Sequence, residues 1–262
     1  MTGAGLPPML NFVGLGHSHI VALAKGAYAL EAKGAEVGGR AICGRFRYLY
    51  DADFTPPFAD EARTRLNPAI GAVLSDGAAD FVLLSIGGNE HNVVSMRQPA
   101  RRFDFILGET PDAPLDPKAE IVPEAAIRET LRDYMSENMR VLEAIRAASD
   151  LPMALVEPPP PLPRAQVLAY PKEFFRSQID QRSMSPDILR RKVWRVQVGM
   201  MRRACAALGV AYIETPPDMF DADGLLKTSA CGQDATHANE SYGETMIELA
   251  ARLMTAPAQG SG

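Results

Sequence analysis

The chain has 262 residues, of which 47% are hydrophobic and 23% are charged, and its formal net charge at pH 7 is −5. These proportions are those of an ordinary globular protein, and the negative charge argues against a general nucleic-acid-binding function. No apolar run approaches the roughly 18–20 residues that a membrane-spanning helix needs. The three cysteines cannot all pair within one chain, and the N-terminus lacks the features of a secretory signal, so we expect a cytoplasmic protein.

Short apolar runs alternate with amphipathic stretches along the whole chain. The alternation predicts βαβ units, a parallel sheet and helices on both faces of that sheet. Ser185 and Asn239 are the expected N-caps of the last two helices. We expect strands at 10–15, 40–46, 80–86, 153–156 and 210–214, and helices at 18–32, 61–74, 123–149, 186–208 and 239–254.

The sequence divides into one main domain and three minor segments. Residues 10–255 are the expected single domain, preceded by an N-terminal extension at 1–9. The proline-rich stretch at 95–123 is typical of an inserted loop, which we expect to cover the site as a lid. Residues 256–262 are the expected disordered tail.

All four histidines of the chain lie in three short blocks that follow predicted strands, the third of them after a loop. The blocks are GHSH at 16–19, GGNEH at 87–91 and DATH at 234–237. Functional groups in parallel α/β sheets gather beyond the carboxyl ends of the strands. We therefore expect the three blocks to converge on one site.

The first block has some features of a nucleotide-binding loop. Gly14 and Gly16 fit the first two positions of the dinucleotide pattern G-x-G-x-x-G, but His19 occupies the third, and no glycine follows before Gly26. The Gly-Lys-Ser/Thr of a P-loop is absent as well. The sequence thus argues against a bound dinucleotide, and we expect no cofactor.

A nucleophile turn fits the first block better. A serine at a strand-to-helix turn has an exposed hydroxyl, and the helix N-terminus favours negative charge beside it. Asp234 and His237 supply a carboxylate and a base at a compact spacing, and the amide of Asn89 can hold a developing oxyanion. Taken singly, Ser18 is also a good helix N-cap and Asn89 a common turn residue.

On these three blocks, in this order, the chain resembles the SGNH, or GDSL-type, hydrolase superfamily over about residues 10–254. The resemblance implies a flavodoxin-like, three-layer α/β/α sandwich. It also implies hydrolysis or transfer of acyl groups on small esters, lipids or carbohydrates. It places the nucleophile on Ser18, the orienting acid and base on Asp234 and His237, and the oxyanion-hole asparagine on Asn89.

The resemblance also implies an oxyanion-hole glycine after the second strand, to act with the Ser18 backbone N–H. Gly44 is the expected residue, and Gly38 or Gly39 are the alternatives. Two positions depart from the family pattern, because His17 and Glu90 both stand where the family has aspartate.

The remaining histidines, His17, His19 and His91, admit two interpretations. With Asp234 and His237 they could surround a zinc ion that activates water. However, residues two apart on a helical turn do not share a face, which separates His17 from His19. We expect no metal, and we expect these histidines to line the substrate pocket or to pack beside it.

The sequence therefore predicts a serine esterase that acts on a small ester, such as an O-acyl or O-acetyl carbohydrate or a short-chain ester. Its expected partner is that small molecule, with no nucleic acid and no membrane. The alternatives are an acyltransferase with the same residues, a metal-dependent hydrolase, and a non-catalytic binding module. The last is suggested by His17, which stands where the family has aspartate.

Overall fold

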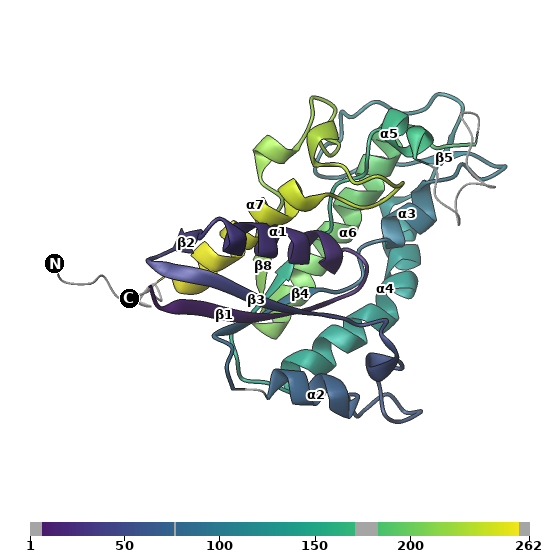
Figure 1. Ribbon diagram of the computed structural model, residues 1–262. Helices are drawn as coiled ribbons and strands as arrows, with labels where there is room; N and C mark the ends of the chain where they lie inside the picture. Colours follow the sequence, from purple (N-terminus) through teal and green to yellow (C-terminus); the bar gives the residue numbers. More distant parts are fainter. Residues whose placement is uncertain (1–6, 76, 171–182, 257–262) are drawn as a thin grey trace, which may run out of the picture.

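The computed structural model describes residues 7–75, 77–170 and 183–256 (Figure 1). Its main sheet contains β1 (Met9–Gly16), β2 (Glu36–Val37), β3 (Arg40–Tyr48), β4 (Phe81–Ser85), β7 (Met153–Val156) and β8 (Ala211–Ile213). The strand order is β2-β3-β1-β4-β7-β8, and every pair is parallel except β2 and β3. The five parallel strands thus run second, first, third, fourth, fifth. This is the flavodoxin-like order, and it confirms the expected fold class.

Helices cover both faces of this sheet and complete the α/β/α sandwich. One face packs against α1 (Ile20–Ala32) and α7 (Glu240–Thr255), and the other against α2 (Pro68–Leu74), α4 (Glu124–Ala147) and α6 (Asp187–Leu208). The shorter helices are α3 (Glu90–Ser95) and α5 (Arg164–Ala169), and three 3-10 turns lie at Ala52–Phe54, Pro217–Met219 and Thr228–Ala230. Within the described residues, no helix combines the length and apolarity that crossing a membrane requires.

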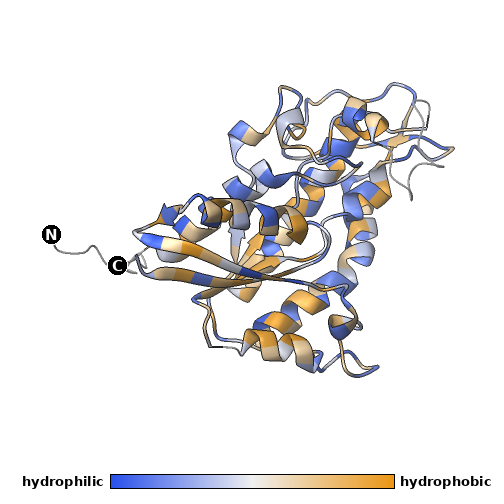
Figure 2. Cartoon of the chain, viewed as in Figure 1, coloured by the Kyte–Doolittle hydropathy of each residue, from blue (hydrophilic) through white to orange (hydrophobic). Residues whose placement is uncertain are grey.

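The alternation of side chains along each strand divides the core into two halves. On β1, Phe12 belongs to the half beneath α1 and α7, whereas its neighbour Val13 belongs to the half beneath α2, α4 and α6. All five residues of β4 are buried, because helices cover the sheet on both sides. The long helix α4 alternates between hydrophobic and hydrophilic stretches, as expected of a helix with one buried face (Figure 2).

Two expected helix starts are wrong. The helix predicted at 61–74 begins only at Pro68, where Asn67 accepts a hydrogen bond from the Ala69 N–H at 2.9 Å. Proline suits the first helical turn but breaks a helix interior, so the helix starts there. Ser185 does not cap α6, which begins at Asp187 with Pro186 in the cap position. Asn239 does cap α7, as predicted, by accepting from the Tyr242 N–H.

The segment at 95–123 is anchored to the body of the molecule. It forms two short strands, β5 (Phe103–Asp104) and β6 (Glu120–Ile121), which pair in parallel. Asp104 forms an ion pair with Lys192 of α6, and both side chains are 1% exposed. The ammonium of Lys192 also donates to the Phe105 carbonyl at 2.9 Å. Of the chain ends, residues 1–6 of the expected extension and 257–262 of the expected tail lie outside the described residues.

Two glycines bring α1 and α7 into backbone contact. A Cβ on Gly243 would lie 1.9 Å from the Ala22 carbonyl oxygen, and one on Gly26 would lie 2.2 Å from the Glu244 nitrogen. Neither position has room for a side chain. Since α1 follows the GHSH block and α7 follows the DATH block, this contact sets the distance between the two blocks.

Replacing Gly243 by alanine is therefore expected to lower the free energy of unfolding by about 1–3 kcal/mol, because a methyl group must be forced between two backbones. The matched control is Gly71→Ala in α2, where a Cβ would meet nothing within 4 Å. That change is expected to be neutral or slightly stabilising. Urea unfolding of both variants measures the difference. Equal stability of the two would contradict the close helix contact.

Candidate active site

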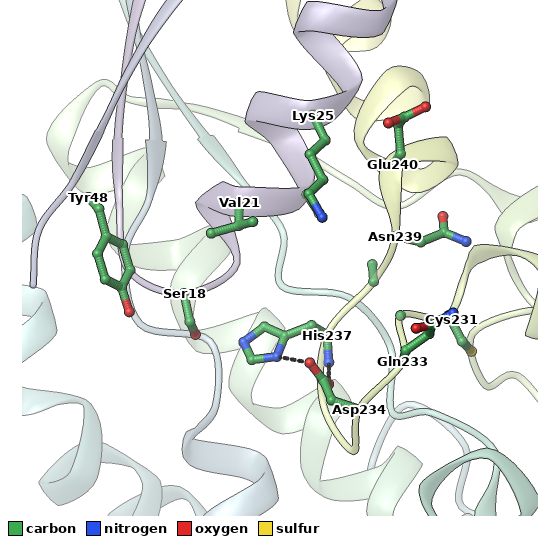
Figure 3. Close-up of a pocket in the computed structure, with 13 residues that line it drawn as sticks. Ser18, Val21, Lys25, Tyr48, Cys231, Gln233, Asp234, His237, Asn239 and Glu240 are labelled. Atoms are coloured by element: carbon green, nitrogen blue, oxygen red, sulfur yellow. Dashed lines mark hydrogen bonds and ion pairs between the residues drawn. The ribbon is translucent and has the colours of Figure 1, made fainter. Parts of the chain in front are cut away.

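Ser18, Asp234 and His237 line one cavity of about 690 Å³ (Figure 3). Its walls come from the start of α1, the end of β3 and the loop that precedes α7. The structure therefore brings together the first and third sequence blocks, which are more than two hundred residues apart in the chain. No residue of the segment at 95–123 lines this cavity. The expectation that this segment is a lid over the site is thus wrong.

Ser18 stands in the turn between β1 and α1. The turn is fixed where the His17 N–H donates to the Ser85 carbonyl of β4 at 2.9 Å. Helix α1 begins at Ile20 with His19 in the cap position, and no side chain caps it. Ser18 therefore does not serve as the N-cap of α1, and its hydroxyl points into the cavity (Figure 3).

The loop before α7 is organised by the carboxylate of Asp234. Its Oδ1 accepts from the backbone N–H groups of Thr236 and His237, at 2.9 and 2.8 Å. Its Oδ2 contacts Nδ1 of the His237 ring at 2.8 Å. One side chain thus shapes the loop and orients the imidazole, and the spacing D-x-x-H is what makes both possible.

This contact assigns the tautomer of the neutral His237 ring. An ionised carboxylate can only accept, so in the neutral ring Nδ1 carries the proton and Nε2 presents a lone pair. Burial disfavours the charged Asp234, but the hydrogen bonds from the His237 ring and the two backbone N–H groups hold its pKa well below the ordinary value. The ring lies between Asp234 and Ser18, with Nε2 on the Ser18 side (Figure 3).

Nε2 of His237 is buried and makes no hydrogen bond with any described residue, Ser18 included. The serine and histidine thus face one another with no hydrogen bond between them (Figure 3). Such contacts are often long before a substrate binds and shorten in the reacting complex.

Asn89, from the second block, stands at the N-cap position of α3. Its Oδ1 accepts from Nδ2 of Asn92 at 3.1 Å, which leaves its NH₂ group as the donor for other partners. It is not among the residues that line the cavity. Instead it lies beside His19, whose ring centroid is 4.9 Å from that of His237.

Glu90 holds the turn that carries Asn89. Its Oε2 accepts from the Gly88 N–H at 2.8 Å and from Nε2 of Gln197 at 2.7 Å, and its Oε1 accepts from Nδ2 of Asn138 at 2.5 Å. The glutamate side chain, one methylene longer than aspartate, thus reaches α4 and α6. Gln197 and Asn138 are site-supporting residues that sequence reasoning missed, because nothing local in the sequence links them to the second block.

The expected oxyanion-hole glycine is corrected by the structure. Gly44 lies inside β3 opposite Phe12, four residues before the strand ends beside Gly16. A Cβ on Gly44 would lie 2.6 Å from the Phe12 ring, so this glycine makes room for an aromatic side chain. The alternatives, Gly38 and Gly39, sit at the other end of the strand, in the turn between β2 and β3.

None of His17, His19 and His91 is among the residues that line the cavity, which favours the second of their two expected roles, packing beside the pocket. All three are buried, with exposed fractions of 9% or less. Burial lowers the pKa of His17 to about 4 and that of His91 to about 3. Burial, together with the nearby His237 and His91, lowers the pKa of His19 well below 6.5. The three imidazoles are therefore neutral at pH 7 and pack around the site.

His17 ties β1 to the turn after β4. Its Nδ1 accepts from the Gly87 N–H at 2.9 Å, which places the ring proton on Nε2. Within the residues that the structure describes, no group of three or more His, Cys, Asp or Glu side chains is arranged to hold a metal ion.

No family model and no curated protein matches the chain. Similar solved structures include the periplasmic domain of a lipopolysaccharide acetyltransferase from Salmonella ser. Paratyphi A, with 12% identity, 95% of this chain and 85% of that chain covered, and a TM-score of 0.49. Phospholipase A1 from Streptomyces albidoflavus is 12% identical, with coverages of 95% and 100% and a TM-score of 0.40. A GDSL-like lipase from Bacteroides thetaiotaomicron is 9% identical, with coverages of 94% and 87% and a TM-score of 0.40. At this level of similarity, the chemistry of this chain has to be inferred from its own residues.

Proposed function

We propose that this protein is a serine hydrolase of the SGNH type that cleaves a small ester. The observation that carries the proposal is the Asp234–His237 hydrogen bond, which leaves the unprotonated Nε2 facing the Ser18 hydroxyl in one cavity. A base held in one tautomer beside an uncommitted hydroxyl is the arrangement that activates serine as a nucleophile.

The proposed reaction has two stages. His237 takes the proton of Ser18 as the serine oxygen attacks the acyl carbon, and Asp234 stabilises the resulting imidazolium. His237 then gives that proton to the leaving alcohol, and an acyl-serine remains. Water, deprotonated by His237, attacks the acyl-serine, and the proton returns to Ser18 as the carboxylic acid leaves. Transfer to an acceptor hydroxyl would follow the same steps with an alcohol in place of water.

The proposed oxyanion hole contains the backbone N–H of Ser18 and the NH₂ group of Asn89. Two other nearby backbone donors already have acceptors within the protein: the Gly87 N–H donates to His17 and the Gly88 N–H donates to Glu90. Loss of one oxyanion donor typically lowers kcat about 10²–10³-fold. If removing the Asn89 side chain lowered kcat much less than this, another group would be the second donor of the oxyanion hole.

Labelling with a fluorophosphonate probe tests the proposal. We expect mass spectrometry to find the probe on Ser18, and Ser18→Ala to abolish both labelling and hydrolysis of p-nitrophenyl acetate. The matched control is Ser136→Ala, at an exposed serine on α4, which should leave both unchanged. Labelling that persists in Ser18→Ala, or hydrolysis that a chelator abolishes, would contradict the serine mechanism.

A further inference from the structure

The loop after β3 presents an aromatic ring next to the Ser18 cavity. Tyr50 is 60% exposed, although it is a large side chain. Its ring centroid lies 4.7 Å from that of His17, with the ring planes inclined by 32°. Tyr48, which lines the cavity, meets the Tyr50 ring edge-on at 5.4 Å. One side of the Tyr50 ring thus packs against His17, the residue that precedes Ser18.

The support beneath Tyr50 is fixed. His17 is 9% exposed, and its ring is held by the hydrogen bond from the Gly87 N–H. Leu49, the residue before Tyr50, donates its N–H to the Gly16 carbonyl at 2.8 Å. A ring held in this way loses little conformational freedom when a ligand packs on it. The histidine that replaces the family's aspartate therefore has a role, which is to support this ring.

The wall of the Ser18 cavity combines polar and apolar side chains. Lys25, Gln233 and Glu240 line it as exposed polar residues, and Val21 and Ala22 are among its apolar ones (Figure 3). A long acyl chain would need an apolar channel, because burial of its surface is what drives binding. A mixed cavity wall, joined through Tyr48 to an exposed aromatic ring, instead suits a ligand that has an apolar face and hydroxyl groups along its edge.

We propose that Tyr50 is a sugar-stacking residue and that the alcohol portion of the ester is a carbohydrate ring bearing a small acyl group. This rests on the proposed hydrolase function. The C–H face of the sugar covers the Tyr50 ring and excludes water from both surfaces. The hydroxyl groups at its edge then hydrogen-bond with the polar side chains of the cavity wall.

Steady-state kinetics on two acetates provide the first test. We expect Tyr50→Ala to raise the ratio of KM for a mono-O-acetylated methyl glucoside to KM for ethyl acetate about tenfold, the size of one aromatic contact. Tyr50→Phe, which keeps the ring, should restore the ratio. Tyr28→Ala is the matched control, because Tyr28 is 52% exposed and contacts Phe46 edge-on, away from the cavity lining. An unchanged ratio in Tyr50→Ala would overturn the proposal.

Calorimetry separates this inference from the proposed chemistry. Binding of the same acetylated glucoside is measured to Ser18→Ala and to the double variant Ser18→Ala, Tyr50→Ala, neither of which can turn it over by the proposed route. We expect about tenfold weaker binding to the double variant. Such a loss would support the sugar site even if Ser18 resists labelling. Equal binding to both variants, or none to either, would overturn the sugar site even if Ser18 is labelled.

Discussion

Asp234→Asn is expected to lower kcat for ester hydrolysis about 10⁴-fold while changing KM little, as a wrong histidine tautomer does in serine hydrolases. The amide oxygen of asparagine can still accept from the backbone N–H groups of Thr236 and His237, so the loop is kept. The NH₂ group then faces Nδ1 of His237 and can only donate to it. The ring proton moves to Nε2, where the base for Ser18 is needed.

The matched control for this change is Asp60→Asn. Asp60 also accepts from two backbone N–H groups of its own loop, those of Thr64 and Arg65, but it lies outside the cavity lining. Its replacement should leave kcat unchanged. If Asp234→Asn kept more than about a tenth of the activity, the tautomer assignment of His237 would be wrong, and with it the role of Asp234.

Lowering the pH from 7 to 5 is expected to destabilise the protein by about 4 kcal/mol through the buried imidazoles of His17 and His91, with a further loss in the same direction from His19. Burial lowers the pKa of His17 to about 4 and of His91 to about 3, and it lowers that of His19 well below 6.5. On unfolding, each ring regains a pKa near 6.5. Below that pH the unfolded chain binds more protons, so the free energy of unfolding falls as the pH falls.

Each imidazole contributes about 1.4 kcal/mol per pH unit between pH 6.5 and its own folded-state pKa. Because a domain of this kind has a total stability of about 5–15 kcal/mol, this loss is a large fraction of the total, and the urea concentration at the midpoint of unfolding should fall clearly between pH 7 and pH 5. Asp234 contributes no loss in this window, since its carboxylate remains charged in both states. Urea unfolding at pH 7, 6 and 5 measures the slope.

A variant isolates one of the three imidazoles in the pH experiment. His17→Asn places an amide oxygen where Nδ1 accepts from the Gly87 N–H, and it cannot titrate. The proton uptake on unfolding at pH 5 should therefore fall by about one. An unchanged uptake would show that His17 is already protonated in the folded protein.

Much of the architecture is predictable because it depends on local patterns. The strand at 153–156 and the helix near 123–149 were expected within one or two residues, since a buried run and a helical period are visible in the sequence. The pairing of Asp234 with His237 is equally local, as both lie on one loop. In contrast, α3 and α5 span six residues each and are too short to show a period.

The errors arose where a role depends on distant neighbours. Gly44 lies inside the strand that the sequence itself predicts at 40–46, so its choice as a residue beyond the strand end conflicted with that range, and β3 continues still further, to Tyr48. Likewise, the grouping of the histidines in three blocks is correct, but their burial is set by helices that pack behind those blocks. A sequence pattern gives the end of the sheet at which a residue lies, and not whether its side chain faces a cavity.

The sequence by itself determined the order of the five parallel strands and the five longest expected helices, the turn that holds Ser18 and the loop that joins Asp234 to His237, because each depends on residues close together in the chain. Only the tertiary structure decided that these two segments share a cavity. That outcome depends on Gly26 and Gly243, which let α1 and α7 touch backbone to backbone. The physical reason is steric: the missing side chains act between segments that are distant in sequence, where no local pattern records them.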